Sequence, residues 1–108
     1  MSKLQLEELP IEINIRNIKS KVIIDNNYMT MKNLILNSYE KIPEHNVPVN
    51  VTFLVLDGRG QITIGNNIYD VIKNSIVLCP PNTTMSVSAG KEGLSFINIK
   101  TPGIKILK

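Results

Sequence analysis

Apolar residues recur at every second position through most of the chain, and turn-forming residues separate these runs. Segment 11–18 places Ile11, Ile13 and Ile15 on one face and polar side chains on the other, which predicts a half-buried strand. Similar runs predict further strands over 21–25, 28–36, 51–56, 61–64, 68–72, 75–79, 84–88, 94–100 and 104–107. No segment longer than a turn has helical periodicity. The pattern therefore predicts an all-β chain of antiparallel strands, folded as a sandwich or a barrel.

The turns between these runs follow from their residue types. Paired asparagines at 26–27 accept the positive φ that tight turns require, and Pro80-Pro81 ends the strand before it because proline donates no ladder hydrogen bond. Gly58-Arg59-Gly60 is interpreted as the tip of a hairpin between 51–56 and 61–64. The polar segment 37–46, which contains Pro43, is expected to be an irregular connection that leads His45 to the central strand.

Composition narrows the possible classes of protein. The chain of 108 residues predicts one domain spanning 1–108. Its net charge of +3 comes from scattered lysines and arginines, so no nucleic-acid partner is expected. No apolar run is long enough to span a membrane, and the first residues contain no apolar secretory segment, which together predict a cytoplasmic protein without a membrane partner. The single cysteine, Cys79, has no partner for an intramolecular disulfide.

Two stretches resemble the sequence motifs of the cupin superfamily. In the first motif, His45, Val47, Val51 and Gly58 occupy the positions of two histidines, a glutamate and a glycine. In the second motif, Asn74, Pro80, Asn82 and Met85 occupy the positions of a glycine, a proline, a glycine and a histidine. Asparagine enters the left-handed region more readily than other non-glycine residues, so both turns are expected to survive the replacement of glycine.

The resemblance covers about residues 40–104 and implies a single antiparallel jelly-roll β-barrel. In metal-binding cupins the two histidines, the glutamate and the third histidine converge on one divalent metal inside the barrel. Here Val47, Val51 and Met85 replace three of these four ligands, and His45 alone supplies too few donors for a stable site. We therefore expect a member of this fold with degenerate metal motifs, no bound metal, no cofactor and no assigned catalytic residue.

The favoured function is binding of a small organic ligand in a mostly apolar, metal-free cavity. The residues expected to line this cavity, from their parity and motif positions, are His45, Val47, Val51, Phe53, Cys79 and Met85. Asn50 and Asn98 are further candidates for polar contacts. His45 is interpreted either as a general base or ligand contact at the cavity mouth or as a polar residue that caps the start of a strand, and Cys79 as a small core residue.

Two other functions remain open on the sequence alone. A metal-dependent enzyme that resembles sugar-phosphate isomerase-type cupins would need the ligands that Val47, Val51 and Met85 replace. A dimerising sensor domain would act with a separate partner protein. Segment 51–56 is apolar on both faces apart from Thr52, so Leu54 and Leu56 need cover from outside the barrel, and we expect a homodimer.

Overall fold

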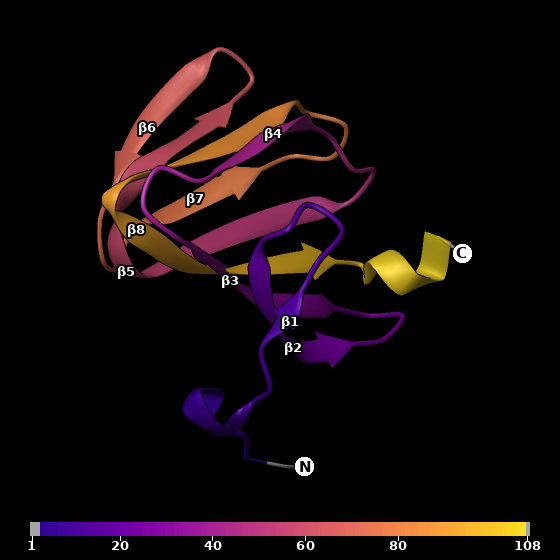
Figure 1. The fold of residues 1–108 in the computed structure, drawn as a ribbon. Coiled ribbons are helices and arrows are strands. Elements are labelled where there is room, and N and C mark those ends of the chain that lie inside the picture. The colour runs from indigo at the N-terminus through magenta and orange to yellow at the C-terminus, as the bar shows by residue number, and fades with distance from the viewer. Residues whose placement is uncertain (1–2, 108) are drawn as a thin grey trace.

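The computed structural model describes residues 3–107, in which eight antiparallel strands form one strongly curled sheet. The elements are η1 (Leu6–Glu8), β1 (Glu12–Ile13), β2 (Lys19–Asp25), β3 (Thr30–Leu36), β4 (Lys41–His45), β5 (Asn50–Ile64), β6 (Asn67–Val71), β7 (Ile76–Cys79), β8 (Met85–Thr101) and η2 (Ile104–Leu107). The strand order is β1-β2-β3-β8-β5-β6, with β4 paired to β8 and β7 paired to β5. The strands curve around a common interior, whereas η1 lies outside it, where Lys21 of β2 donates a hydrogen bond to the carbonyl oxygen of Leu6 (Figure 1). The predicted all-β antiparallel architecture is confirmed.

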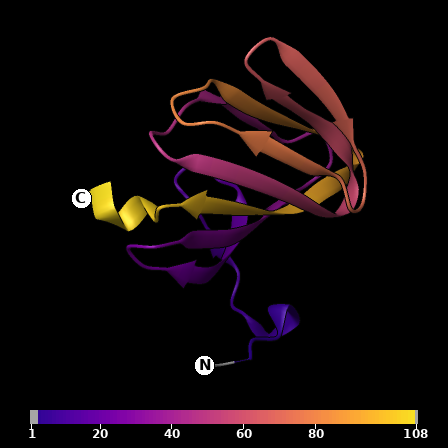
Figure 2. The same cartoon turned by 180° about the vertical axis from the view of Figure 1, so that it is seen from behind.

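The two longest strands, β5 and β8, hold the barrel together. β5 pairs with β8 along most of its length, from Asn50 opposite Thr101 to Ile64 opposite Met85. The view from behind shows both strands bending around one end of the barrel (Figure 2). The predicted hairpin at Gly58-Arg59-Gly60 is therefore wrong: 51–56 and 61–64 are one continuous strand, and 84–88 and 94–100 are likewise parts of β8.

Glycine permits these bends. The register between β5 and β8 shifts between Val55 and Asp57 and again between Gly58 and Gly60, as at β-bulges. Gly58 has φ +84°, and a Cβ there would collide with the carbonyl oxygen of Gly93 on β8. The residues that predicted a hairpin tip instead bend one strand around the barrel, because glycine favours both geometries.

Three other segments also differ from the prediction. β4 forms within 37–46 and pairs with β8, with a register shift around Pro43, which lacks a donor for the ladder. Residues 104–107 form the 3₁₀ helix η2 rather than a strand. Only Glu12–Ile13 of segment 11–18 is a strand, and Ile11, Ile13 and Ile15 are exposed rather than half-buried. A turn at 14–18 interrupts the alternation there.

The interior has a fully apolar region at the bend of β5 and β8, which we call the closed end. Its side chains are each at most 3% exposed: Leu36, Val55, Ile62, Val71, Ala89 and Leu94. Because these residues come from β3, β5, β6 and β8, the hydrophobic effect draws strands that are distant in sequence around one core. No helix within residues 3–107 is long and apolar enough to cross a bilayer.

Candidate functional site

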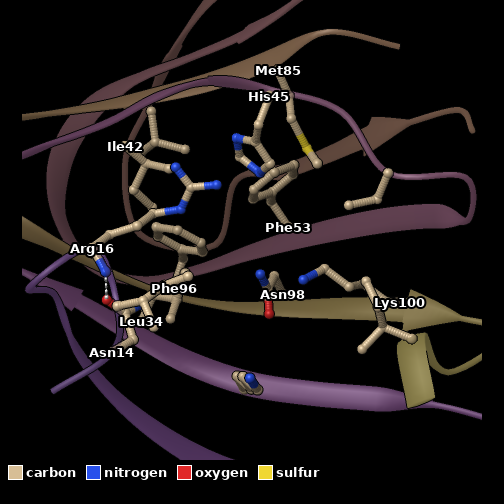
Figure 3. Close-up of a pocket in the computed structure, with 15 residues that line it drawn as sticks. Asn14, Arg16, Leu34, Ile42, His45, Phe53, Met85, Phe96, Asn98 and Lys100 are labelled. Atoms are coloured by element: carbon tan, nitrogen blue, oxygen red, sulfur yellow. Dashed lines mark hydrogen bonds between the residues drawn. The ribbon is translucent and has the colours of Figure 1, made fainter. Parts of the chain in front are cut away.

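At the other end of the barrel the interior opens into a cavity of about 300 Å³. Its apolar wall consists of side chains from the turn after β1, from β3, β4, β5, β8 and η2, and from the segment after β4: Ile15, Leu34, Ile42, Val47, Phe53, Met85, Val87, Phe96 and Ile104. The rings of Phe53 and Phe96 pack at a tilt, with their centroids 5.5 Å apart. Six polar residues complete the lining: Asn14, Arg16, Lys32, His45, Asn98 and Lys100. The cavity thus combines an aromatic floor with a polar rim (Figure 3).

The turn at 14–18 places Arg16 at this rim. Asn14 Oδ1 accepts hydrogen bonds from the backbone N–H groups of Arg16 at 2.9 Å and Ile18 at 3.0 Å. Asn17 adopts the left-handed conformation, with φ +62°, which asparagine tolerates better than most residues. The Arg16 side chain extends from this turn toward His45 (Figure 3). Asn14 and Asn17 therefore stabilise a turn where a strand was predicted, and this turn places the Arg16 guanidinium at the cavity.

His45 lies at the end of β4, opposite Met85 of β8. Its Nδ1 lies 3.0 Å from the carbonyl oxygen of Pro43, so Nδ1–H donates to that oxygen and Nε2 is free to accept a hydrogen bond in the neutral ring. Burial lowers the pKa of His45, the hydrogen bond to Pro43 opposes this shift, and the nearby charges of Arg16 and Lys100 lower the pKa further. At neutral pH the ring is therefore uncharged and acts as a polar contact.

Asn98 on β8 carries a polar group that lacks a partner. Its register partners are Phe53 on β5 and Lys32 on β3, and its side chain is 8% exposed. Its Oδ1 is buried and accepts no hydrogen bond from any described residue. An unpaired buried carbonyl oxygen costs about 1–3 kcal/mol, so Asn98 lowers the stability of the folded protein.

Three cations, Arg16, Lys32 and Lys100, form what we call the cationic rim. Burial lowers the pKa of Lys100, and the positive charges of Lys32 and Arg16 lower it further. Among the described residues that line the cavity there is no aspartate or glutamate to offset these charges. The rim therefore has an uncompensated positive potential.

Comparisons with known proteins agree on the fold. No family model matches the sequence, and no curated protein matches it. Among solved structures, an RmlC-like cupin from Shewanella frigidimarina aligns with TM-score 0.84 at 14% identity, over 94% of this chain and 91% of that one. KdgF from Halomonas sp. aligns with TM-score 0.88 at 11% identity, over 100% and 99% of the two chains.

A third structure, an uncharacterised conserved protein with a double-stranded β-helix domain from Klebsiella pneumoniae, aligns with TM-score 0.82 at 17% identity, over 96% and 92% of the two chains. These alignments extend over nearly the whole of each chain. The chain has the cupin fold. The resemblance inferred from the two motifs is thus confirmed at the level of fold. Asn74 and Asn82, which stand at the motif's glycine positions, have φ +74° and +60°.

The cavity of this chain does not fit the metal ion that metal-binding cupins hold. Of the four ligand positions, His45, Val47 and Met85 line the cavity, but only His45 offers a donor suited to Zn, Mn or Fe(II). Residues 3–107 contain no group of three or more histidine, cysteine, aspartate or glutamate side chains that could hold a metal ion. The cationic rim also repels a divalent cation.

The six predicted cavity residues fall into two groups in the structure, those that line the cavity and those buried in the core. His45, Val47, Phe53 and Met85 come together in the lining. Val51 and Cys79, which are register partners on β5 and β7, are buried in the core and are absent from the lining. Burial raises the pKa of the Cys79 thiol, so the group stays protonated. Of the two candidate asparagines, Asn98 lines the cavity, whereas Asn50 is exposed and donates to the carbonyl oxygen of Thr101.

The cationic rim as a whole does not emerge from the sequence patterns. Alternation over 11–18 predicts a strand with Arg16 on its polar face, and no motif includes Lys32 or Lys100. Lys32 and Lys100 share the parity of the buried residues Leu34 and Phe96 on their strands, so strand alternation alone points both lysines inward. That signal was available in the sequence, whereas the position of Arg16 depends on a turn that the alternation concealed.

Proposed function

We propose that this cupin binds a small organic molecule in its cavity without a metal ion. The single observation that carries this proposal is the cavity itself, about 300 Å³ in volume, whose apolar wall includes Phe53 and Phe96 and whose lining also includes the polar side chains of His45 and Asn98. A mostly apolar cavity with a few polar groups is typical of sites that bind small molecules. A ligand that packs on Phe53 and Phe96 and hydrogen-bonds to these polar groups covers the aromatic floor.

A fragment screen by NMR tests the proposal, with ¹³C-methyl signals of Met85 and Val47 reporting the cavity. We expect shift changes at Met85 for binders, and we expect Val47→Phe to abolish them by filling the space. Ile76→Phe is the matched control, because it adds the same ring at a position that is 65% exposed and outside the cavity. Binding that persists in Val47→Phe would place the ligand elsewhere, and the absence of any cavity binder would refute the proposal.

Metal analysis of protein purified without a chelator tests the metal-free part. We expect no stoichiometric transition metal. Of the four ligand positions in the metal motif, three line the cavity but supply only one imidazole, and the remaining one, Val51, faces the core. A stoichiometric metal that is lost in His45→Ala would contradict the proposal and revive the isomerase alternative. The geometry of the cavity offers no observation in favour of that alternative.

The homodimer also remains a prediction. On the outer face of the sheet, Ile76 and Leu78 of β7 are 65% and 68% exposed, and their register partners Leu54 and Thr52 on β5 are half-buried. A second copy covering this face would remove apolar surface from water. Sedimentation velocity tests it: we expect a dimer that dissociates in Ile76→Ser with Leu78→Ser, and a monomeric parent protein would refute the prediction.

A further inference from the structure

The cavity's charge identifies the class of ligand more closely than its shape does. Arg16 comes from the turn after β1, Lys32 from β3 and Lys100 from β8, so three separate segments bring positive charge to one rim. A solvated surface would leave such side chains in water, but Lys32 and Lys100 are each only partly exposed. Holding like charges together at reduced exposure costs free energy, and a bound anion offsets that cost.

We propose that the ligand is a small organic anion, a carboxylate or a phosphate ester, whose charged group lies at the cationic rim and whose uncharged body packs on Phe53, Phe96 and Met85. This inference rests on the proposed function and names the class of molecule that the same cavity binds. Arg16 presents a planar fork of N–H donors that pairs with a carboxylate or a phosphate through two hydrogen bonds. Lys32 and Lys100 add charge from β3 and β8.

A further polar group specifies a second feature of the ligand. The neutral His45 ring offers Nε2 as an acceptor, because Nδ1 donates to Pro43. This atom does not bind an anionic oxygen, so it requires an O–H or N–H group on the ligand. A hydroxylated organic anion satisfies the cationic rim and this acceptor together.

The perturbed ionisation of the rim supports this assignment. The pKa of Lys100 is lowered by burial and by the charges of Lys32 and Arg16, and no described carboxylate in the cavity counters these effects. A bound anion favours the charged form and raises the pKa of Lys100 again. Ligand binding and the charge of Lys100 are therefore linked: an anion binds more weakly as the pH rises through that pKa.

Matched pairs of fragments provide the test. Each pair consists of a hydroxylated carboxylate or phosphate ester and its uncharged amide or alcohol analogue, titrated by NMR with Met85 and Val47 methyl signals as the reporters of the cavity. We expect the anion of a pair to bind at least about tenfold more tightly, and we expect the advantage to shrink at about 0.5 M salt. The ratio between carboxylates and phosphates then distinguishes the two sources of anionic charge.

Variants test whether the rim causes this preference. Lys100→Met and Arg16→Gln should each reduce the anion's advantage by roughly three- to tenfold while leaving the uncharged analogue's affinity unchanged. Lys73→Met is the matched control, because it removes the same charge from an exposed turn outside the cavity. Arg16→Gln preserves the fold even if Lys100→Met does not, because Asn14 holds the turn through the backbone of Arg16.

The outcomes separate this inference from the proposed function. If uncharged analogues bind in the cavity as tightly as the anions, the assignment of an anion is overturned and the proposed function stands. If no fragment moves the Met85 or Val47 signals, the proposed function fails and the inference fails with it. If Lys73→Met weakens the anion as much as Lys100→Met does, the preference is a property of the net charge and not of the rim.

Discussion

At the closed end of the barrel, β5 and β8 contribute Val55, Ile62 and Leu94 to a core that is almost wholly excluded from water; at the cavity, β8 contributes Asn98 and Lys100. The same two strands therefore build both ends. The closed end gains stability from apolar burial, whereas the cavity retains an unpaired carbonyl oxygen and three uncompensated cations. A region that lowers stability without a structural benefit is typical of a site kept for function. The following experiments test that contrast.

The largest loss of stability should come from shortening a buried side chain at the closed end. Ile62 is 0% exposed, so Ile62→Ala removes buried methyl groups and leaves a space that the surrounding barrel fills only in part. We expect the free energy of unfolding to fall by about 3 kcal/mol, measured by urea denaturation. Val47→Ala is the control at the cavity, where the lost atoms border existing space, and we expect a loss below about 1 kcal/mol. Equal losses at both positions would contradict the contrast between the two ends.

The bend that leads β5 to the closed end provides the next test. Gly58→Ala introduces a Cβ at φ +84° that collides with the carbonyl oxygen of Gly93. We expect a loss of about 2–3 kcal/mol in urea denaturation, since both strain and a backbone displacement are imposed.

Gly65→Ala separates these two causes. Gly65 also has a positive φ of +59°, but its added Cβ would approach only Thr83 Cγ2, at 3.9 Å. We expect a loss of about 1 kcal/mol, which reflects the backbone conformation alone. If Gly58→Ala is at least as stable as Gly65→Ala, the fold does not depend on the close approach of β5 and β8 at this bend.

Two buried asparagines on neighbouring strands compare a structural polar group with a functional one. Asn33 Nδ2 donates to Ser95 Oγ at 3.1 Å and to the Phe96 carbonyl oxygen at 2.9 Å, whereas Asn98 Oδ1 has no partner. We expect Asn33→Leu to destabilise the protein by about 1–2 kcal/mol and Asn98→Leu to stabilise it by about 1 kcal/mol. Thermal and urea denaturation measure both effects.

The same two variants also test ligand binding, for which we expect the opposite ranking. Asn98→Leu should lose affinity for hydroxylated fragments as it gains stability, and Asn33→Leu should keep that affinity, because Asn33 does not line the cavity. A destabilised Asn98→Leu variant would mean that its amide is satisfied in the folded protein, and the contrast between the two asparagines would be lost.

The fold was more accessible from sequence than the cavity. Alternation of period two identified the strands, and asparagine's tolerance of positive φ predicted the turns at Asn74 and Asn82. The hairpin at Gly58-Arg59-Gly60 was wrong because glycine marks a tight turn and a bulged bend equally well. The pairing of β5 with β8 across the barrel decides between these two geometries, and a short stretch of sequence does not show which strands pair.

The candidate site was only partly predictable for a related reason. Motif positions and parity led to His45, Val47, Phe53 and Met85, all of which line the cavity. They also led to Val51 and Cys79, which face the core, because parity assigns a side chain to the interior without stating which end of the barrel it occupies. The charge in the cavity was accessible only in part: alternation points Lys32 and Lys100 inward, but the position of Arg16 depends on a turn within the predicted strand 11–18.

The smallest expected effect is the contribution of His45 to the pH dependence of stability. The pKa of His45 also reports the electrostatic potential in the cavity. Its pKa lies below the ordinary value of 6.5, chiefly because of burial, so the unfolded chain binds a proton more readily than the folded one. The contribution of His45 to stability is therefore present above about pH 6.5 and is lost as the pH falls toward the folded-state pKa. We expect this part of the decline to disappear in His45→Gln, measured by urea denaturation between about pH 7.5 and pH 5.

The charges at the cavity set part of that pKa, which makes His45 a reporter of the rim. It is the only histidine in the sequence, so its ring signals in an NMR titration are unambiguous. Because Arg16 and Lys100 both lower the pKa of His45, Arg16→Gln and Lys100→Met should each raise it, and Lys73→Met should leave it unchanged. A bound organic anion should raise the same pKa in the unmodified protein. A His45 pKa that responds to none of these changes would show that burial alone sets it and that the rim exerts no field on the cavity.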